Sequence, residues 1–202
     1  MRKWFFKWRG ALMVPLAIII LLLGKPTPAS FFAGIAVALL GEALRIWGVG
    51  YAGKTTRGEE VKAPCLVTAG PFAHVRNPLY LGNAITGLGF TVMACGAAPP
   101  FVVALLMILF LLFYVTVYGT IIPLEEEFLR ETFGDPYSEY CSHVPRIVPR
   151  LSPYEKKQGT FSWMPIKSGE SETLVLFALF SLIMLGKVPQ WGGVLLQRIF
   201  PS

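Results

Sequence analysis

The sequence predicts an all-α integral membrane protein, a bundle of about five transmembrane helices with a helical C-terminal region on the cytoplasmic side. Three observations predict this fold class. First, 54% of the 202 residues are hydrophobic and only 15% are charged, whereas soluble domains carry about a quarter charged residues. Second, the mean hydropathy is +0.58. Third, several long stretches carry almost no charge, which is the signature of helices that cross a bilayer.

Five apolar segments are the candidate membrane helices, approximately residues 11–24, 30–50, 78–97, 101–122 and 173–185. We interpret the first as a signal anchor. A cleaved signal peptide is the alternative, because residues 27–30 resemble a cleavage context. The fifth falls short of the roughly 20 residues of a straight span, so a fifth crossing and a re-entrant hairpin are both open. We expect the glycine-rich third segment to form a tight hairpin with the fourth.

The distribution of Lys and Arg orients these helices. The N-terminus, the loop of residues 51–76 and the segment after Ile122 carry most of the positive charge, and the turn at residues 97–100 carries none. By the positive-inside rule, the loop and the segment after Ile122 lie on the cytoplasmic side. Two polar segments that are distant in sequence therefore meet at one membrane face.

The composition also excludes some function classes. The net charge is +6, but the basic residues form no stripe with interleaved aromatics, so we expect contact with membrane lipids and no binding to nucleic acid. Cys65, Cys95, Cys141, His74 and His143 are scattered, and no cysteine pair has metal-site spacing. We therefore expect neither a disulfide framework nor a bound metal.

Glu42 and Arg45 lie three residues apart in the second apolar segment and share a helix face. Charged groups at this depth are costly unless they are paired or hydrated. The pair is either a structural ion pair or the border of a polar pocket.

The first polar segment that suits chemistry is residues 66–82. Its Gly70 predicts a turn that exposes backbone donors just before a membrane helix, and Pro78 suits the first turn of that helix. Arg76 adds a fixed positive charge, and Phe72 and Tyr80 add aromatic faces for a flat ring or a cation. An ordinary interfacial loop is the alternative interpretation.

The second polar segment begins with Glu125 and Glu126, where we expect an amphipathic helix to open at Leu124. Neighbouring residues of a helix point about 100° apart, so one carboxylate can face a pocket while the other faces solvent or a cation such as Arg76. A solvated acidic cap is the alternative. Residues 134–136 break this helix. We expect a second short helix with Tyr137, Tyr140 and Cys141 to follow, and we interpret residues 150–169 as a linker.

Together the two segments resemble the isoprenylcysteine carboxyl methyltransferase family and, more loosely, the membrane phospholipid methyltransferases. The chain shows, in order, LVTAGPF at 66–72, RNPLYLG at 76–82, EE at 125–126, FGDPYSEY at 133–140 and VPR at 144–146. The resemblance covers residues 40–150 of a single domain, residues 1–202, in which residues 151–202 are a linker plus an extra hydrophobic segment.

The resemblance implies a methyltransferase that binds S-adenosylmethionine at its cytoplasmic face, in the helical C-terminal region and the preceding loop. The acceptor would be a lipophilic small molecule or a prenylated group. The catalytic residues are not defined, with Arg76 and Glu126 as candidates, and His74 is the nearest base for an amine or thiol acceptor. The residues implied to bind the cofactor are Leu66, Val67, Gly70, Phe72, Asn77, Pro78, Tyr80 and Glu125.

Three positions depart from the family pattern. Asn77 stands where the family has histidine, Phe72 stands where it has tyrosine, and residues 116–124 lack the arginine that precedes the acid pair in the eukaryotic enzymes. The methylated atom, oxygen, nitrogen or sulfur, is therefore open. Two other functions are also open: a non-catalytic member of the family, and a membrane reductase with a similar bundle, although the chain has no G-x-G-x-x-G fingerprint.

Overall fold

The computed structural model describes residue 8 and residues 10–53 and 64–189. The basic N-terminal residues and residues 54–63, on which part of the orientation argument depends, lie outside the described residues. The described part is all-helical. Its elements are a 3-10 turn at Ala11–Met13, α2 (Val14–Leu23), α3 (Pro28–Ala52), a 3-10 turn at Gly70–Ala73, α4 (Pro78–Ala94), α5 (Pro100–Phe133), α6 (Asp135–His143), α7 (Met164–Gly169) and α8 (Ser171–Gly186).

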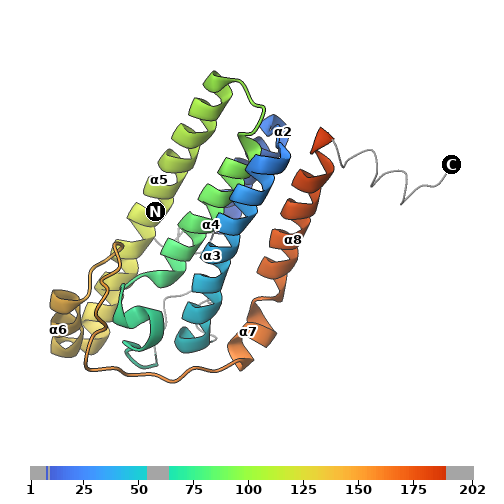
Figure 1. Ribbon diagram of the computed structural model, residues 1–202. Coiled ribbons are helices and arrows are strands. Elements are labelled where there is room, and N and C mark those ends of the chain that lie inside the picture. Colours follow the sequence, from blue (N-terminus) through green and yellow to red (C-terminus); the bar gives the residue numbers. More distant parts are fainter. Residues whose placement is uncertain (1–7, 9, 54–63, 190–202) are drawn as a thin grey trace.

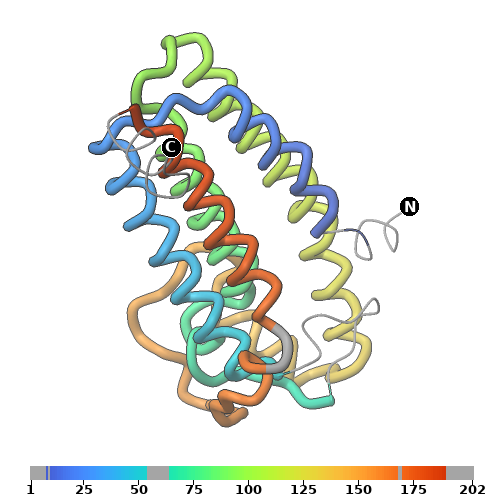
Figure 2. The backbone as a smooth tube through the Cα atoms, turned by 90° about the vertical axis from the view of Figure 1, so that its right-hand side faces the viewer, coloured from blue at the N-terminus to red at the C-terminus, as the bar shows by residue number. Residues whose placement is uncertain are grey.

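Five of these helices, α2, α3, α4, α5 and α8, run side by side along the long axis of the molecule (Figure 1). The short helices α6 and α7 lie at the same end of the bundle, on opposite sides of it, and we call this end the polar end (Figures 1 and 2). Within the described residues, only α3 and α5 are long and apolar enough to cross a membrane by themselves, since α4 has 17 residues and α8 has 16. Five full crossings therefore stay a prediction.

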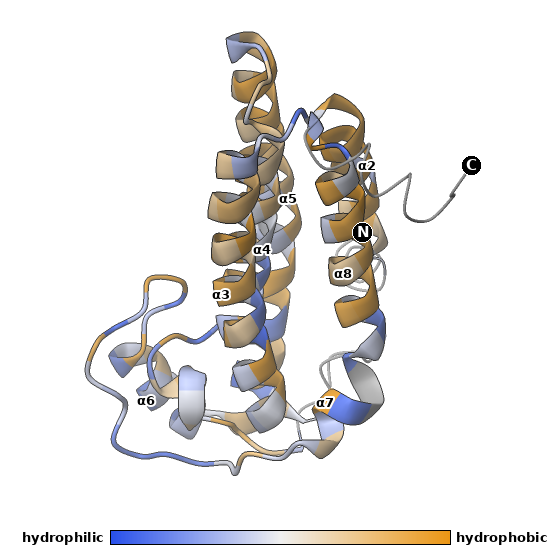
Figure 3. Ribbon diagram, turned by 45° about the vertical axis from the view of Figure 1, so that its right-hand side comes forward, coloured by the Kyte–Doolittle hydropathy of each residue, from blue (hydrophilic) through white to orange (hydrophobic). Residues whose placement is uncertain are grey.

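The surface of the bundle has the chemistry of a lipid-facing surface. Large apolar side chains are exposed along the outer helices, among them Phe32 on α3, Phe101 and Val115 on α5, and Val175 and Leu182 on α8. Figure 3 shows apolar colouring along the helices and more hydrophilic colouring at α6, α7 and the loop between them. Such a large apolar exposure is typical of a surface covered by lipid.

The helix ends follow from local sequence. Thr27 and Ser30 form a capping box at the start of α3, which satisfies free amide groups of the first turn. Proline occupies the first turn of α4 and of α5, where its missing N–H costs nothing. Gly134 ends α5 with a φ of 58°, a left-handed conformation that glycine adopts without steric cost.

The glycine-rich third segment packs closely, but its partner differs from the prediction. The expected tight hairpin of α4 with α5 is wrong, because the close partner of α4 is α3. A Cβ atom on Gly41 would lie 2.4 Å from the backbone nitrogen of Thr86, and one on Gly89 would lie 2.4 Å from that of Ala38. The absence of side chains lets the two backbones touch, and α5 stands further from α4 across a cavity described below.

Two other expectations need correction, and the choice between a fifth crossing and a re-entrant hairpin stays open. No new helix opens at Leu124, because α5 continues through Pro123 to Phe133. Proline removes one helical hydrogen bond there without ending the helix, as membrane helices tolerate. The predicted linker contains helix α7. Over the fifth apolar segment α8 is one uninterrupted helix, and residues 190–202, which a re-entrant hairpin would need, lie outside the described residues.

Candidate active site

Two segments distant in sequence form the base of the site by pairing with each other. We call residues 144–163, between α6 and α7, the strap. The amide groups of Thr68 and Ala69 donate to the carbonyl of Gln158 at 2.9 and 3.1 Å. The amide of Tyr154 donates to the carbonyl of Ala73 at 2.8 Å. These bonds fix the motif of residues 66–82 against the polar end of the bundle.

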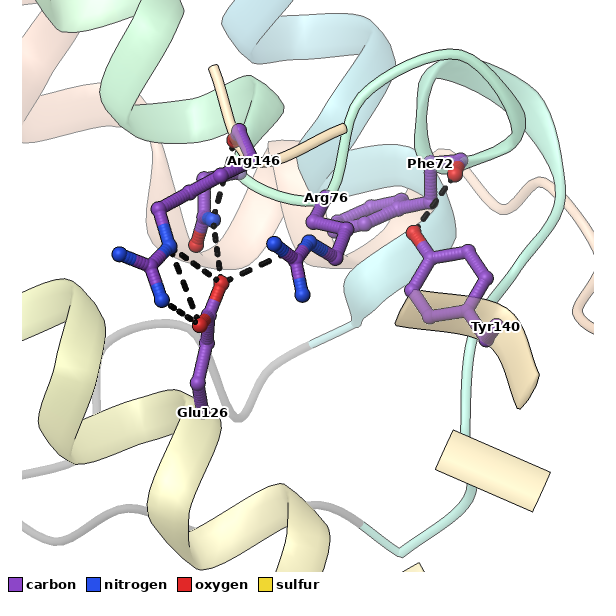
Figure 4. A network of polar contacts seen from close by, with 6 residues as sticks. Phe72, Arg76, Glu126, Tyr140 and Arg146 are labelled. Atoms are coloured by element: carbon purple, nitrogen blue, oxygen red, sulfur yellow. Dashed lines mark hydrogen bonds and ion pairs between the residues drawn. The ribbon is translucent and has the colours of Figure 1, made fainter. Parts of the chain in front are cut away.

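Glu126 is the centre of the polar network at this end (Figure 4). It is 3% exposed, and its carboxylate accepts from the Arg146 guanidinium at 2.5 and 3.1 Å. Nε of Arg76 lies 3.6 Å from Oε1 of Glu126. The Asn77 amide donates to Glu126 at 3.4 Å and to the carbonyl of Arg146 at 3.1 Å. One buried carboxylate thus holds α5, the 66–82 motif and the strap together.

Glu125 points to a different side of α5, as the helical geometry predicts. The Tyr80 hydroxyl donates to its carboxylate at 2.6 Å. The ring of Tyr80 packs at 4.8 Å from that of Tyr118, which lies 4.5 Å from that of Tyr114. The Tyr114 hydroxyl donates to the backbone carbonyl of Tyr80. Three tyrosines of α4 and α5 therefore form one rigid aromatic wall beside the Glu125 carboxylate.

This wall borders a cavity of about 1010 Å³ that runs between the helices. Asn77, just before α4, and Tyr80, in its first turn, line one end of the cavity, and Gly87 and Phe90, further along α4, line the other end. The cavity therefore has a polar end and an apolar end. The polar end is lined by Leu66, Val67, Phe72, Arg76, Asn77, Tyr80, Glu125, Tyr137 and Tyr140, and the apolar end by Leu16, Ala17, Ile20, Gly87, Phe90, Phe110, Leu176 and Phe180.

The phenols of α6 keep their protons at this polar end. Burial raises the pKa of Tyr137 and of Tyr140 well above the ordinary value, and the nearby Glu126 carboxylate raises both further. The Tyr140 hydroxyl donates to the carbonyl of Phe72 at 2.7 Å. The hydrogen bond that Arg146 donates to the Glu126 carboxylate raises the pKa of Arg146. The site thus offers neutral phenols and permanently charged arginines.

The structure brings most of the predicted site residues to this cavity. Those that line it are Leu66, Val67, Phe72, Arg76, Asn77, Tyr80 and Glu125. Glu126 lies behind them, buried against Arg76, so a solvated acidic cap is the wrong interpretation for this residue. Arg45 also lines the cavity and lies 3.9 Å from Glu42, so this pair is an ion pair and Arg45 borders the pocket as well.

Three predicted residues do not line the cavity. Gly70 has a φ of 60° and packs on Tyr51, whose ring a Cβ atom would meet at 2.3 Å, so its role is to make the turn. Pro78 is buried in the first turn of α4. His74 turns its ring nitrogen to the carbonyl of Arg150 at 2.9 Å. The suggestion that His74 is the nearest base is therefore wrong.

Three residues that build the site were not predicted from the sequence. Arg146 neutralises Glu126, and the only signal was its place in the VPR motif. Asn83 lines the cavity and donates to the Tyr118 hydroxyl at 3.1 Å. Glu170, at the junction of α7 and α8, is 2% exposed and bonds Arg45 at 2.6 Å.

The polar end fits S-adenosylmethionine by the chemistry of its donors. Glu125 can accept from an ammonium or a ribose diol, and the tyrosine wall and Phe72 suit a flat ring or a sulfonium cation. Nε of Arg76 is buried, makes no hydrogen bond within the described ranges and faces the Glu126 carboxylate at 3.6 Å. The guanidinium therefore adds a positive charge at the polar end, which suits a carboxylate. The volume exceeds what one drug-sized ligand needs, about 300–1,000 Å³ at most sites, so an acceptor has room as well. Within the same ranges no cluster of three or more His, Cys, Asp or Glu could hold a metal.

The fold and the site define a membrane-embedded helical protein with one cavity shared by a polar and an apolar compartment. The model of the isoprenylcysteine carboxyl methyltransferase (ICMT) family matches residues 34–131. The chain is 34% identical over 123 residues to protein-S-isoprenylcysteine O-methyltransferase B of Arabidopsis thaliana. This alignment covers 57% of this chain and 57% of that one. It is 32% identical over 122 residues to a probable protein-S-isoprenylcysteine O-methyltransferase of Oryza sativa subsp. japonica, 58% of this chain and 60% of that one.

Over residues 34–131, a little less than half of its length, the chain is similar to the ICMT family. It is also 31% identical over 157 residues to the cobalt-zinc-cadmium resistance protein CzcN of Cupriavidus metallidurans, 78% of this chain and 59% of that one. The matches cover 57% to 60% of the length of these relatives. No solved structure matches the chain. The region matched by the family model begins inside α3 and ends inside α5, so α2, the strap and α6 to α8 lie outside it.

Proposed function

We propose that the protein is an S-adenosylmethionine-dependent methyltransferase that methylates a lipophilic acceptor at the membrane surface. The single observation that carries the proposal is the continuity of the cavity, whose polar end fits the cofactor and whose apolar end fits an acyl or prenyl chain. The match to the family model over residues 34–131 supports methyl transfer. The cofactor supplies an electrophilic methyl group, and the chain mainly needs to align the reacting groups.

The residues then divide into two groups. Glu125, Tyr80, Arg76 and Phe72 hold the cofactor, while Glu126 and Arg146 position Arg76 and Asn77 without touching it. An acceptor carboxylate needs no base, which agrees with a polar end where no histidine of the described ranges lines the cavity. An apolar acceptor gains roughly 25 cal/mol per Å² of buried apolar surface, whereas a small hydrophilic acceptor would lose its hydration and gain little.

The test is a methyl-transfer screen in nanodiscs with labelled cofactor. It compares prenylated cysteine and other prenylated thiols, phosphatidylethanolamine, and small soluble thiols and acids. We expect turnover of at least one lipophilic class and little turnover of the soluble compounds. Calorimetry with S-adenosylmethionine and, separately, NADPH tests the cofactor. If only the soluble acceptors react, or if only NADPH binds, the proposal is wrong.

Substitutions at the polar end give the second test. Glu125→Gln and Tyr80→Ala should each weaken the binding of S-adenosylmethionine about ten- to a hundredfold, because a hydrogen bond to a charged group is typically worth about 1.5–3 kcal/mol. Calorimetry measures the dissociation constants. Glu127→Gln, on the exposed side of the same turn, is the matched control. Unchanged affinity in both site variants, with the fold intact, would contradict the assignment of the cofactor end.

We also propose a multi-pass topology with the polar end in the cytoplasm, based on the Lys and Arg distribution. In a cysteine-free background, Glu131→Cys, near the end of α5, should react with a membrane-impermeant maleimide only after the cells are opened. Ala97→Cys, in the turn before α5, should react in intact cells. The reverse pattern would overturn this orientation.

A further inference from the structure

Helix α8, which lies outside the region matched by the family model, forms one wall of the cavity. Its residues Thr173, Leu176 and Phe180 line the cavity, and their spacing of three and four places them on one helix face. Val175 and Leu182, on another face, are 63% and 60% exposed. Leu176 lines the cavity and is itself 65% exposed, so the cavity is open to the surface at this level of α8, whereas Phe180 is buried.

Phe180 closes the apolar end of this cavity. It is 8% exposed, and its ring stacks on that of Phe90 at 4.1 Å with an interplanar angle of 23°. Behind the pair lies the close-packed core that includes Met93 and Met184, which are both 0% exposed. A close-packed core yields little to an intruding group, so a chain that enters from the polar end must stop at these two rings.

The helical rise gives the depth of the apolar compartment. Tyr80, in the aromatic wall beside Glu125, and Phe90 belong to the same helix, α4. Their separation in the sequence corresponds to about 15 Å, at about 1.5 Å per residue. This depth suits an extended hydrocarbon tail whose polar head stays near Glu125.

We propose that Phe180, stacked on Phe90, sets the longest acceptor tail that the cavity accommodates. The inference rests on the proposed function, because it gives the apolar compartment to the acceptor. Phe180 is a specificity-determining residue in this assignment, and it belongs to a helix that the family model does not include. Removal of its ring opens space at the end of the compartment for a longer tail, without a change at the polar end.

The kinetic test uses acceptors with one head group and geranyl, farnesyl or geranylgeranyl tails. Phe180→Ala should raise the ratio of kcat/KM for the longest tail to that for the shortest by about tenfold or more, the size of the effect of a methylene in an apolar pocket. The change should appear in KM, with kcat conserved, because the reacting groups are untouched. Phe177→Ala is the matched control. The ring centroids of Phe177 and Phe90 are 5.3 Å apart, but Phe177 does not line the cavity.

A second measurement is independent of turnover. A farnesyl thiol with a photoreactive diazirine at the end of the tail is crosslinked to the wild-type protein, and the labelled peptide is identified by mass spectrometry. Labelling at Phe90 or within residues 176–184 is expected, with competition by the geranylgeranyl thiol stronger in Phe180→Ala than in the wild type. Phe180→Leu serves in the same experiment if the alanine variant does not fold.

The outcomes separate the two ideas. Labelling at α8 without any methyl transfer would leave the tail site standing and remove the proposed function. An unchanged tail preference in a folded Phe180→Ala variant, an equal shift in Phe177→Ala, or labelling confined to the lipid-facing residues of α8 would overturn the role of Phe180.

Discussion

Glu126→Gln should lower the free energy of unfolding by about 3–5 kcal/mol, the usual cost of removing one partner from a buried ion pair. The carboxylate is 3% exposed and lies beside the guanidinium groups of Arg76 and Arg146. In the variant, both cations face a neutral amide. Arg146 is half exposed and solvent screens its charge, so most of the loss comes from Arg76, whose side chain is 14% exposed.

The effect should extend from stability to ligand binding, since Arg76 and Asn77 line the cavity and Glu126 positions both. Thermal unfolding in detergent measures the first effect, and calorimetry with S-adenosylmethionine measures the second. Glu127→Gln changes the same residue type one position further along α5, where the side chain is exposed. It should change neither the unfolding temperature nor the affinity for S-adenosylmethionine by much. If both variants unfold at the same temperature as the wild type, Glu126 is not the anchor of the polar end.

The convergence of the two motifs could be predicted from the sequence because it depends only on topology. The motif of residues 66–82 precedes a membrane helix, and Glu125 and Glu126 follow one, so both meet at the same end of an antiparallel bundle. The division of labour between adjacent carboxylates followed from the helix geometry. In the structure Glu125 faces Tyr80 and the cavity, and Glu126 faces Arg76.

Other features depend on packing that no local pattern records. The glycines of α4 predicted a close helix contact, but glycine spacing does not say which neighbour approaches, and that neighbour is α3. Pro123 suggested a helix boundary, yet α5 continues past it. His74 belongs to the motif of residues 66–82, which lines the site. Its ring nitrogen nevertheless pairs with the carbonyl of Arg150 in the strap and does not face the cavity.

The place of the C-terminal segment was the least predictable feature. Thr173 to Leu185 is uniformly apolar, so its sequence has no periodicity that marks a buried face. The contact that fixes it joins Arg45 and Glu170, which are 125 residues apart. A short apolar helix outside the family motifs thus becomes a wall of the cavity through a single buried ion pair at its start and aromatic stacking along its length.

Glu170→Gln should release this helix and lower the free energy of unfolding by about 3–5 kcal/mol, since it breaks a buried ion pair on one side. Oε2 of Glu170 lies 2.6 Å from the Arg45 guanidinium, and their side chains are 3% and 15% exposed. Arg45 would then keep only Glu42, at 3.9 Å, as a counter-ion among the contacts that the structure gives it. Arg45→Met should cost at least as much, because it removes the cation that Glu42 and Glu170 share.

Hydrogen exchange measured by mass spectrometry locates the effect. In Glu170→Gln the amides of α7 and α8 should exchange faster, while those of α3 and α4, whose backbones are in direct contact, should stay protected. Glu172→Gln is the control, because Glu172 lies in the first turn of α8 and is exposed. A uniform increase across all helices would mean that the ion pair supports the whole bundle, and no increase in α8 would mean that Phe90 and its two aromatic partners hold this wall without help from Glu170.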